Sequence, residues 1–135
     1  MENNEYISKE QKVVWIREQH LAAIKYLAGK GIVDTQVKER LSRYVVPIVS
    51  VWHIEDKRQN GYWVISGNIP SDHVNVETAP EAREALRHFS LKWQLQADKL
   101  RSSNDEMQRK LGVSLEDKAD ALYRLFEDEV IWDGT

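Results

Sequence analysis

The segment from Tyr44 to Glu55 most constrains the fold of this chain. It is rich in β-branched residues, namely Val45, Val46, Ile48, Val49, Val51 and Ile54. Such residues favour strands. Both sets of alternating positions are largely apolar, so we predict a strand that is covered on both faces. Pro47 cannot donate a ladder hydrogen bond, and we expect it near a strand start, an edge or a bulge.

A turn and a second strand follow this segment. Asp56–Gly61 has the composition of a turn. Tyr62–Ser66 is typical of a return strand, and the two strands together predict a β-hairpin. Beyond the break at Gly67–Pro70, alternation around Val74 and Val76 favours a third short strand. Val33–Arg43 is ambiguous, because its weak alternation fits either an edge strand or a short helix.

The first predicted helix begins at a capping box, Ser8 to Gln11, and ends near Ala28. Gly29 and Gly31 supply the turn that stops it. We expect its core-facing stripe to consist of Val13, Val14, Ile16, Leu21, Ile24, Leu27 and Ala28, which recur at helical spacing.

Two more helices are predicted in the second half of the chain. Thr78–Glu81 reads as a capping box that opens a helix to about Arg101. Its core stripe is expected at Ala82, Leu86, Phe89, Trp93, Ala97 and Leu100. Ser102–Gly112 is polar and fits a loop or a frayed helix. Ser114 opens the last helix, to about Val130. Its expected core residues are Leu115, Ala119, Leu122, Phe126 and Val130.

These elements predict an α+β fold, with a small antiparallel sheet packed against two long helices and a C-terminal helix. The sheet consists of the central hairpin and one or two short strands. We expect a single domain over residues 1–135, with a loose N-terminal tail at 1–7 and a loose C-terminus at 133–135.

Composition excludes several classes of function. The chain has 135 residues, no cysteine and a net charge of −3. Disulfides and thiolate metal sites are therefore impossible. The chain also lacks the excess of basic residues that is typical of a nucleic-acid-binding protein. No apolar run is long enough to span a membrane, and the polar N-terminus favours a cytoplasmic location. The four histidines lack the spacing of metal ligands, so we predict no catalytic, cofactor or metal site.

One face of the first helix is a candidate binding site. Trp15, Gln19 and Tyr26 lie at helical spacing on the side opposite the expected core stripe, where a one-sided amphipathic helix carries charges. Either a second layer of the domain covers these aromatic residues, or they contact a partner. That partner is another protein or a second copy of the chain, with neither nucleic acid nor membrane involved.

A second candidate lies on the second predicted helix. Arg83 and Arg87, one turn apart, are placed to hold a carboxylate or phosphate. The alternative interpretation is a solvated face, or an Arg87 that pins the loop at residues 67–73 through Asp72.

Three segments resemble a known family. They are Ser42–Trp52, Trp63–His73 and Ala82–Ala97. Together they are similar to an uncharacterised bacterial family, the domain of unknown function numbered 4826. The resemblance extends from the first helix to the end of the second. It implies a small bacterial cytoplasmic protein, and it supplies no activity or catalytic residue. Asn68 stands where the family pattern has an acidic residue.

Two functional hypotheses follow. The first is a non-catalytic protein-binding module, such as an adaptor or an immunity-type inhibitor, because the chain is compact and acidic and has aromatic residues to spare. The second is a small-molecule binding protein or an enzyme that uses the loop at residues 67–73 with Arg83 and Arg87 to bind an anion or carboxylate.

Overall fold

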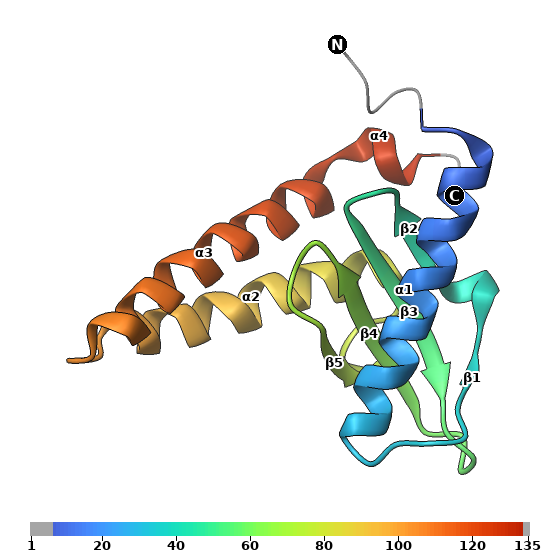
Figure 1. The fold of residues 1–135 in the computed structure, drawn as a ribbon, viewed down its shortest axis with the longest axis horizontal. Coiled ribbons are helices and arrows are strands. Elements are labelled where there is room, and N and C mark those ends of the chain that lie inside the picture. The colour runs from blue at the N-terminus through green and yellow to red at the C-terminus, as the bar shows by residue number, and fades with distance from the viewer. Residues whose placement is uncertain (1–6, 134–135) are drawn as a thin grey trace. The chain divides into compact units, whose positions relative to one another are not determined.

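The computed structural model describes residues 7–133 and divides the chain into two compact units, Met1–Glu77 and Thr78–Thr135. The first unit is a helix on an antiparallel sheet, and the second is a helical hairpin with a short final helix (Figure 1). The predicted α+β class is confirmed. Most of the predicted terminal tails, residues 1–6 and 134–135, lies outside the described residues. A single domain over the whole chain stays a prediction.

The sheet has five antiparallel strands: β1 (Gln36–Val37), β2 (Arg43–Val45), β3 (Val49–Glu55), β4 (Gly61–Gly67) and β5 (Asp72–Asn75). The predicted hairpin is confirmed, since β3 and β4 pair from Val49 opposite Gly67 to Glu55 opposite Gly61. The Asp56 carboxylate accepts hydrogen bonds from the amides of Arg58 and Asn60 and so closes the turn. The short third strand was also predicted, and it is β5.

The prediction of one continuous strand from Tyr44 to Glu55 is wrong. The chain turns at Pro47, and β2 folds back on β3 with Val45 opposite Val49. Proline has no amide hydrogen to donate to a ladder, so the strand ends there and resumes beyond it. The sequence had placed Pro47 near a strand start, an edge or a bulge, and it lies in the turn between two strands.

The ambiguous segment 33–43 contains both of the structures that were weighed. Gln36 and Val37 form β1, which pairs with the end of β3. A single 3-10 turn, η2 (Glu39–Leu41), follows it. The Ser42 hydroxyl donates to the Lys38 carbonyl and accepts from the His53 amide, and these two bonds fasten the turn to β3.

Helix α1 (Lys9–Gly29) lies across one face of the sheet (Figure 1). Its capping box is confirmed: the Ser8 hydroxyl accepts from the Gln11 amide, and the Gln11 side chain accepts from the Ser8 amide. The core between helix and sheet is a cluster of five buried residues, Ala23, Leu27, Trp52, Ile54 and Val64. The opposite face of the sheet carries Val49, Val51, Trp63 and Ile65, which are also buried.

The second unit is built on α2 (Ala82–Arg101) and α3 (Glu106–Glu127), which pack together as a hairpin and are followed by α4 (Glu129–Trp132). The helices approach closely at Gly112, where a Cβ atom would lie 2.9 Å from the Ala97 carbonyl oxygen. Further along, the buried Ser90 hydroxyl donates to the Ala119 carbonyl at 2.7 Å. Small residues thus set the spacing of the two helices.

Two predicted helix starts are wrong. Thr78 lies in a 3-10 turn (Val76–Thr78), and α2 begins only at Ala82, with no side-chain cap at Glu81. Pro80 explains this, because a proline pushes the residue before it out of the helical region. The last long helix begins at Glu106 rather than Ser114, since the Asp105 carboxylate accepts from the Met107 amide and caps it.

The core stripe predicted for α2 is confirmed, except that Leu100 is only half-buried. In α3, Ala119 and Leu122 are buried as predicted. Val130 was placed in the core, and this is wrong: it is 81% exposed on α4. The Asp128 carboxylate accepts from the Val130 amide, starts a new helix there and redirects the chain. Within residues 7–133, no helix combines the length and the apolar character that crossing a bilayer requires.

Candidate functional site

Helix α1 is apolar on two sides, and its fold covers only one of them. The inner side packs on the sheet through Ala23 and Leu27, which are fully buried. Val14 and Leu21 lie on the other side and are 48% and 56% exposed. We call this second side the outer face of α1. Its apolar members are Val14, Leu21 and Ala28, and its charged members are Glu10, Arg17, Glu18 and Lys25.

The predicted core stripe of the first helix is therefore partly wrong. Ile16, Ile24 and Leu27 do pack against the core cluster. The apolar members of the outer face were expected inside and lie outside. Apolar side chains are spread almost evenly around α1, so helical spacing alone did not identify the side that meets the sheet.

Two of the three predicted partner-binding residues make contacts within the first unit. Tyr26 is half-buried, and its hydroxyl lies 2.8 Å from His73 Nδ1 on β5, within hydrogen-bonding distance. The backbone carbonyl of Gln19 accepts a 3.4 Å hydrogen bond from the Ser66 hydroxyl on β4. These contacts place both residues on the flank of α1 that meets β4 and β5. Their role in binding a partner stays a prediction.

Trp15, the third of these residues, is half-buried and borders the outer face. It lines a shallow depression of about 300 Å³ together with Glu10, Gln11, Val14 and Glu18. The floor is apolar, and two carboxylates stand on its rim. An apolar side chain that is flanked by basic groups fits such a depression.

The environment of Tyr26 raises its pKa from 10.0 to about 12. Burial is the largest cause, because it disfavours the charged phenolate, and the negative charge of Asp72 and a hydrogen bond with its side chain add to it. Tyr26 is therefore a neutral hydrogen-bonding group at physiological pH. It joins α1 to β5 and is not poised to lose a proton.

A second cavity, of about 390 Å³, lies on the other flank of α1. Three aromatic rings are part of its lining: His20 and Tyr44 lie 5.2 Å and 4.8 Å from Trp52, measured between ring centroids, and both are tilted against it. Arg17 and Glu39 bring opposite charges to its lining. The Trp52 indole is nearly fully buried and donates to the Ser50 hydroxyl, so it acts chiefly as a packing surface.

The histidines do not form a metal site. The ring of His20 packs at a tilt against Trp52, and His53 and Trp63 meet edge to face with 4.9 Å between ring centroids. Burial lowers the pKa of His53 from 6.5. Its Nδ1 atom is buried and has no hydrogen-bond partner among the residues that the structure describes. Across residues 7–133 no group of three histidine, aspartate or glutamate side chains is placed to hold a metal ion.

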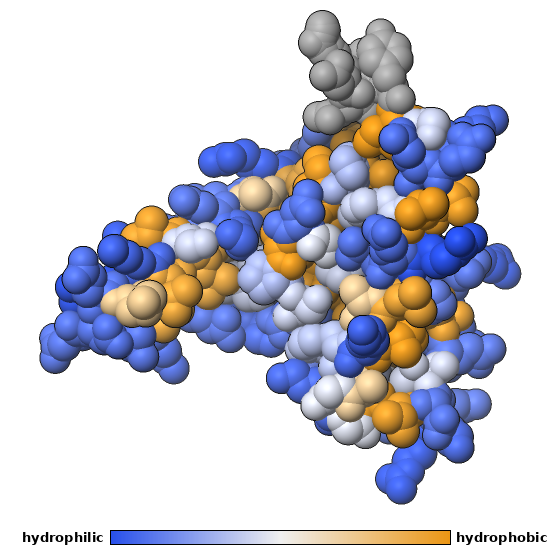
Figure 2. Space-filling model, in the orientation of Figure 1, coloured by the Kyte–Doolittle hydropathy of each residue, from blue (hydrophilic) through white to orange (hydrophobic). Residues whose placement is uncertain are grey.

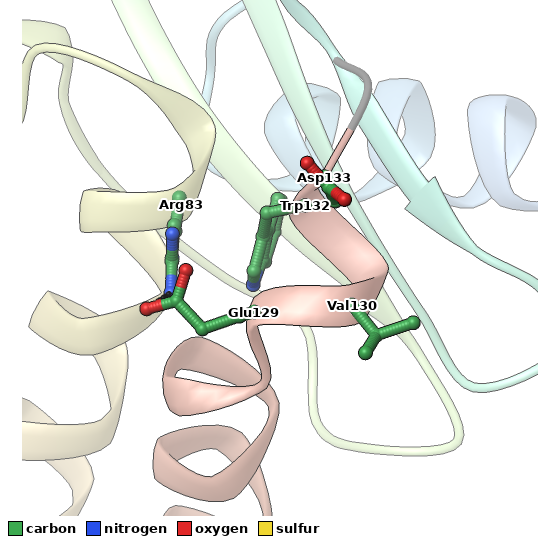
Figure 3. Close-up of a pocket in the computed structure, with 5 residues that line it drawn as sticks. All are labelled: Arg83, Glu129, Val130, Trp132 and Asp133. Atoms are coloured by element: carbon green, nitrogen blue, oxygen red, sulfur yellow. Dashed lines mark ion pairs between the residues drawn. The ribbon is translucent and has the colours of Figure 1, made fainter.

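Arg83, the first of the two predicted anion ligands, makes several contacts within the second unit. Its Nε donates to the Phe126 carbonyl at 2.9 Å, and its Nη2 lies 3.6 Å from a Glu129 carboxylate oxygen. The guanidinium also lies over the rings of Phe126 and Trp132, at 5.4 Å and 5.8 Å. Arg83 and Glu129 line a depression of about 330 Å³. Figure 3 shows their side chains next to each other, with Val130 pointing away.

Arg87, the other predicted anion ligand, is exposed and lies 5.9 Å over the Phe126 ring. The loop at residues 67–73, which was to complete this site, belongs to the first unit, whereas both arginines belong to the second. The anion-binding role stays a prediction. Because Arg83 already contacts a carbonyl, a carboxylate and two rings, an incoming anion would have to compete with these contacts.

The sequence did not predict the outer face of α1 as a surface, because its apolar residues were assigned to the core-facing stripe. One signal was present: Val14, Leu21 and Ala28 recur every seven residues, and charged residues lie between them. Such a repeat is typical of a helix that packs on another helix.

Comparison with curated proteins and with solved structures gives no match. A family model described as Domain of unknown function (DUF4826) matches residues 9–132. This match includes all of α1, the five strands and the helices of the second unit. It agrees with the resemblance seen in three segments of the sequence, and the chain therefore belongs to the DUF4826 family.

Proposed function

We propose that this chain is a non-catalytic protein-binding module that contacts its partner through the outer face of α1. One observation carries the proposal: Val14 and Leu21 are each about half exposed on a helix whose opposite side already packs on the sheet. Water-exposed apolar groups on one helix face favour association, because contact with a partner removes them from water.

The surroundings of these residues support a protein partner. Figure 2 looks onto the outer face of α1 and shows apolar residues interspersed with charged ones over this helix. The depression beside Trp15 adds an apolar floor with Glu10 and Glu18 at its edge. Apolar residues within a charged rim are the usual composition of a protein interface. The partner is expected to present apolar side chains next to charges that complement this rim.

The test is site-specific cross-linking in the cells that naturally produce the chain. A photoreactive benzoylphenylalanine replaces Val14 or Leu21 in two variants. A third variant carries it at Val113 of α3, which is 50% exposed and so matches Val14 at 48%. We expect discrete protein adducts from positions 14 and 21, and none from 113. Mass spectrometry then identifies the cross-linked protein.

A charge-inserting control completes the experiment. Leu21→Asp in the Val14 cross-linking variant should abolish the adduct, because burial of an unpaired carboxylate in an interface is costly. Far-ultraviolet circular dichroism must show that this variant keeps its helical content. No adduct at either position, or equal adducts from all three, would overturn the proposed function.

A further inference from the structure

We propose that the partner on the outer face of α1 is a second copy of this chain, bound so that the two α1 helices run antiparallel about a two-fold axis. This inference rests on the proposed function and names its partner. A two-fold interface brings the same surface together from both copies, so the surface must complement itself. The order of charged and apolar residues along α1 meets that requirement.

The register follows from the apolar residues. Leu21 is the most exposed of the large apolar residues of α1, and Val14 lies two turns before it on the same side. In an antiparallel pair, Val14 of each copy can lie opposite Leu21 of the other. The contact between Val14 and Leu21 then forms once on each side of the two-fold axis, and it removes four apolar side chains from water.

The same register pairs the charges of the outer face. When Val14 lies opposite Leu21, Glu10 lies opposite Lys25, and Arg17 lies opposite Glu18. Each of these pairs joins opposite charges, and each occurs twice in the dimer. A parallel arrangement in register would instead set each charge opposite its own copy, and like charges repel. Charge therefore selects the antiparallel pairing.

The residues in this pairing are accessible. Glu10, Val14, Arg17, Glu18, Leu21 and Lys25 are all exposed in the structure. They come from the helix face that points away from the sheet, so a second helix reaches them without any change in the fold. A contact confined to one face of a 21-residue helix is small, and we expect a dimer that dissociates in the micromolar range.

Sedimentation equilibrium on the full chain tests the proposal, with concentrations from about 1 to 300 μM. The wild type should change from monomer to dimer in this range. Glu10→Lys should raise the dissociation constant about tenfold, because the symmetry places a repulsive pair on each side of the axis. Lys25→Glu should do the same. The double variant Glu10→Lys with Lys25→Glu should return to within about threefold of wild type.

Glu106→Lys on α3 is the matched control, since it makes the same charge change on an exposed residue outside this face, and it should leave the dissociation constant unchanged. A wild type that stays monomeric at all concentrations would overturn the dimer. So would a dimer that neither Glu10→Lys nor Leu21→Asp weakens. If the cross-linking experiment captures a different protein at Val14 while the chain is monomeric, the proposed function stands and this inference fails.

Discussion

The phenol oxygen of Tyr26 on α1 lies 2.8 Å from Nδ1 of His73 on β5, within hydrogen-bonding distance, and this contact joins the helix to the last strand of the sheet. The aromatic ring of Tyr26 also lies against that of His73, with 5.5 Å between centroids. The bond adds to the packing of Ala23 and Leu27 on the sheet in orienting α1. That orientation sets which side of the helix remains outside.

Removal of this hydroxyl should destabilise the fold. Tyr26→Phe loses the bond and leaves a half-buried polar partner, and we expect a loss of about 1–2 kcal/mol in the free energy of unfolding. Urea unfolding measures it. Tyr123→Phe is the control, because Tyr123 is exposed and its ring contacts Phe126. It should change the free energy of unfolding by less than about 0.5 kcal/mol. Equal effects would refute the structural role of the Tyr26 hydroxyl.

Alkaline pH should weaken the fold through the same residue. The folded pKa of Tyr26 is about 12 and its ordinary value is 10.0. Between these values the unfolded chain loses the phenolic proton while the folded chain keeps it. Its stabilising contribution is therefore complete below pH 10 and is lost as the pH rises through about 12. Unfolding at several pH values from 9 to 12 should show a shallower decline for Tyr26→Phe than for wild type.

Gly67 should be the glycine that is least tolerant of substitution. Its φ is +144°, and a Cβ there would overlap the Ile48 carbonyl oxygen and lie 2.9 Å from Val49 Cα. We expect Gly67→Ala to cost about 2–4 kcal/mol, because backbone strain and steric overlap add. At Gly29 an added Cβ meets nothing within 4 Å. Gly29→Ala should change the free energy of unfolding by no more than about 0.5 kcal/mol. Thermal unfolding of both variants checks the contrast.

Arg83 should matter more to stability than its neighbour one turn later. Arg83→Lys removes the Nε hydrogen bond to the Phe126 carbonyl and the guanidinium that lies over the rings of Phe126 and Trp132. We expect a loss of about 1–2 kcal/mol. Arg87→Lys affects an exposed side chain and should cost less than about 0.5 kcal/mol. If both variants behave alike in urea unfolding, the Arg83 contacts do not stabilise the unit.

Local signals in the sequence were enough for many elements of the fold. The capping box at Ser8 and the turn residues of the central hairpin each satisfy backbone groups within a few residues, and both were confirmed. The start of α3 at Glu106 was not predicted, because residues 106–110 are mostly polar. Polar residues such as glutamate, glutamine, arginine and lysine are good helix formers, and the cap at Asp105 was not recognised.

Other features depend on contacts between distant residues. Ser102–Gly112 fits a loop or a frayed helix by its sequence, and Gly112 lies within α3, where that helix passes close to Ala97 of α2. The orientation of α1 was likewise not predictable from periodicity. It depends on tertiary contacts such as the packing of His20 on Trp52 and the bond from Tyr26 to His73. Polar residues with a buried partner can occupy the inner side of a helix.

The most direct test of the account is disulfide trapping across the proposed α1 pair. The chain has no native cysteine, so Val14→Cys and Leu21→Cys each introduce a unique thiol. In the antiparallel register, position 14 lies opposite position 21 of the other copy. Two copies of position 14 are about 10 Å apart along the axis, by the 1.5 Å rise per residue, which is too far for a disulfide.

We predict that a mixture of the two variants, under mild oxidation, forms the mixed disulfide dimer at least tenfold faster than either variant alone, as measured by non-reducing electrophoresis. Trapping that is equally slow in all three samples, or equally fast, would contradict the arrangement.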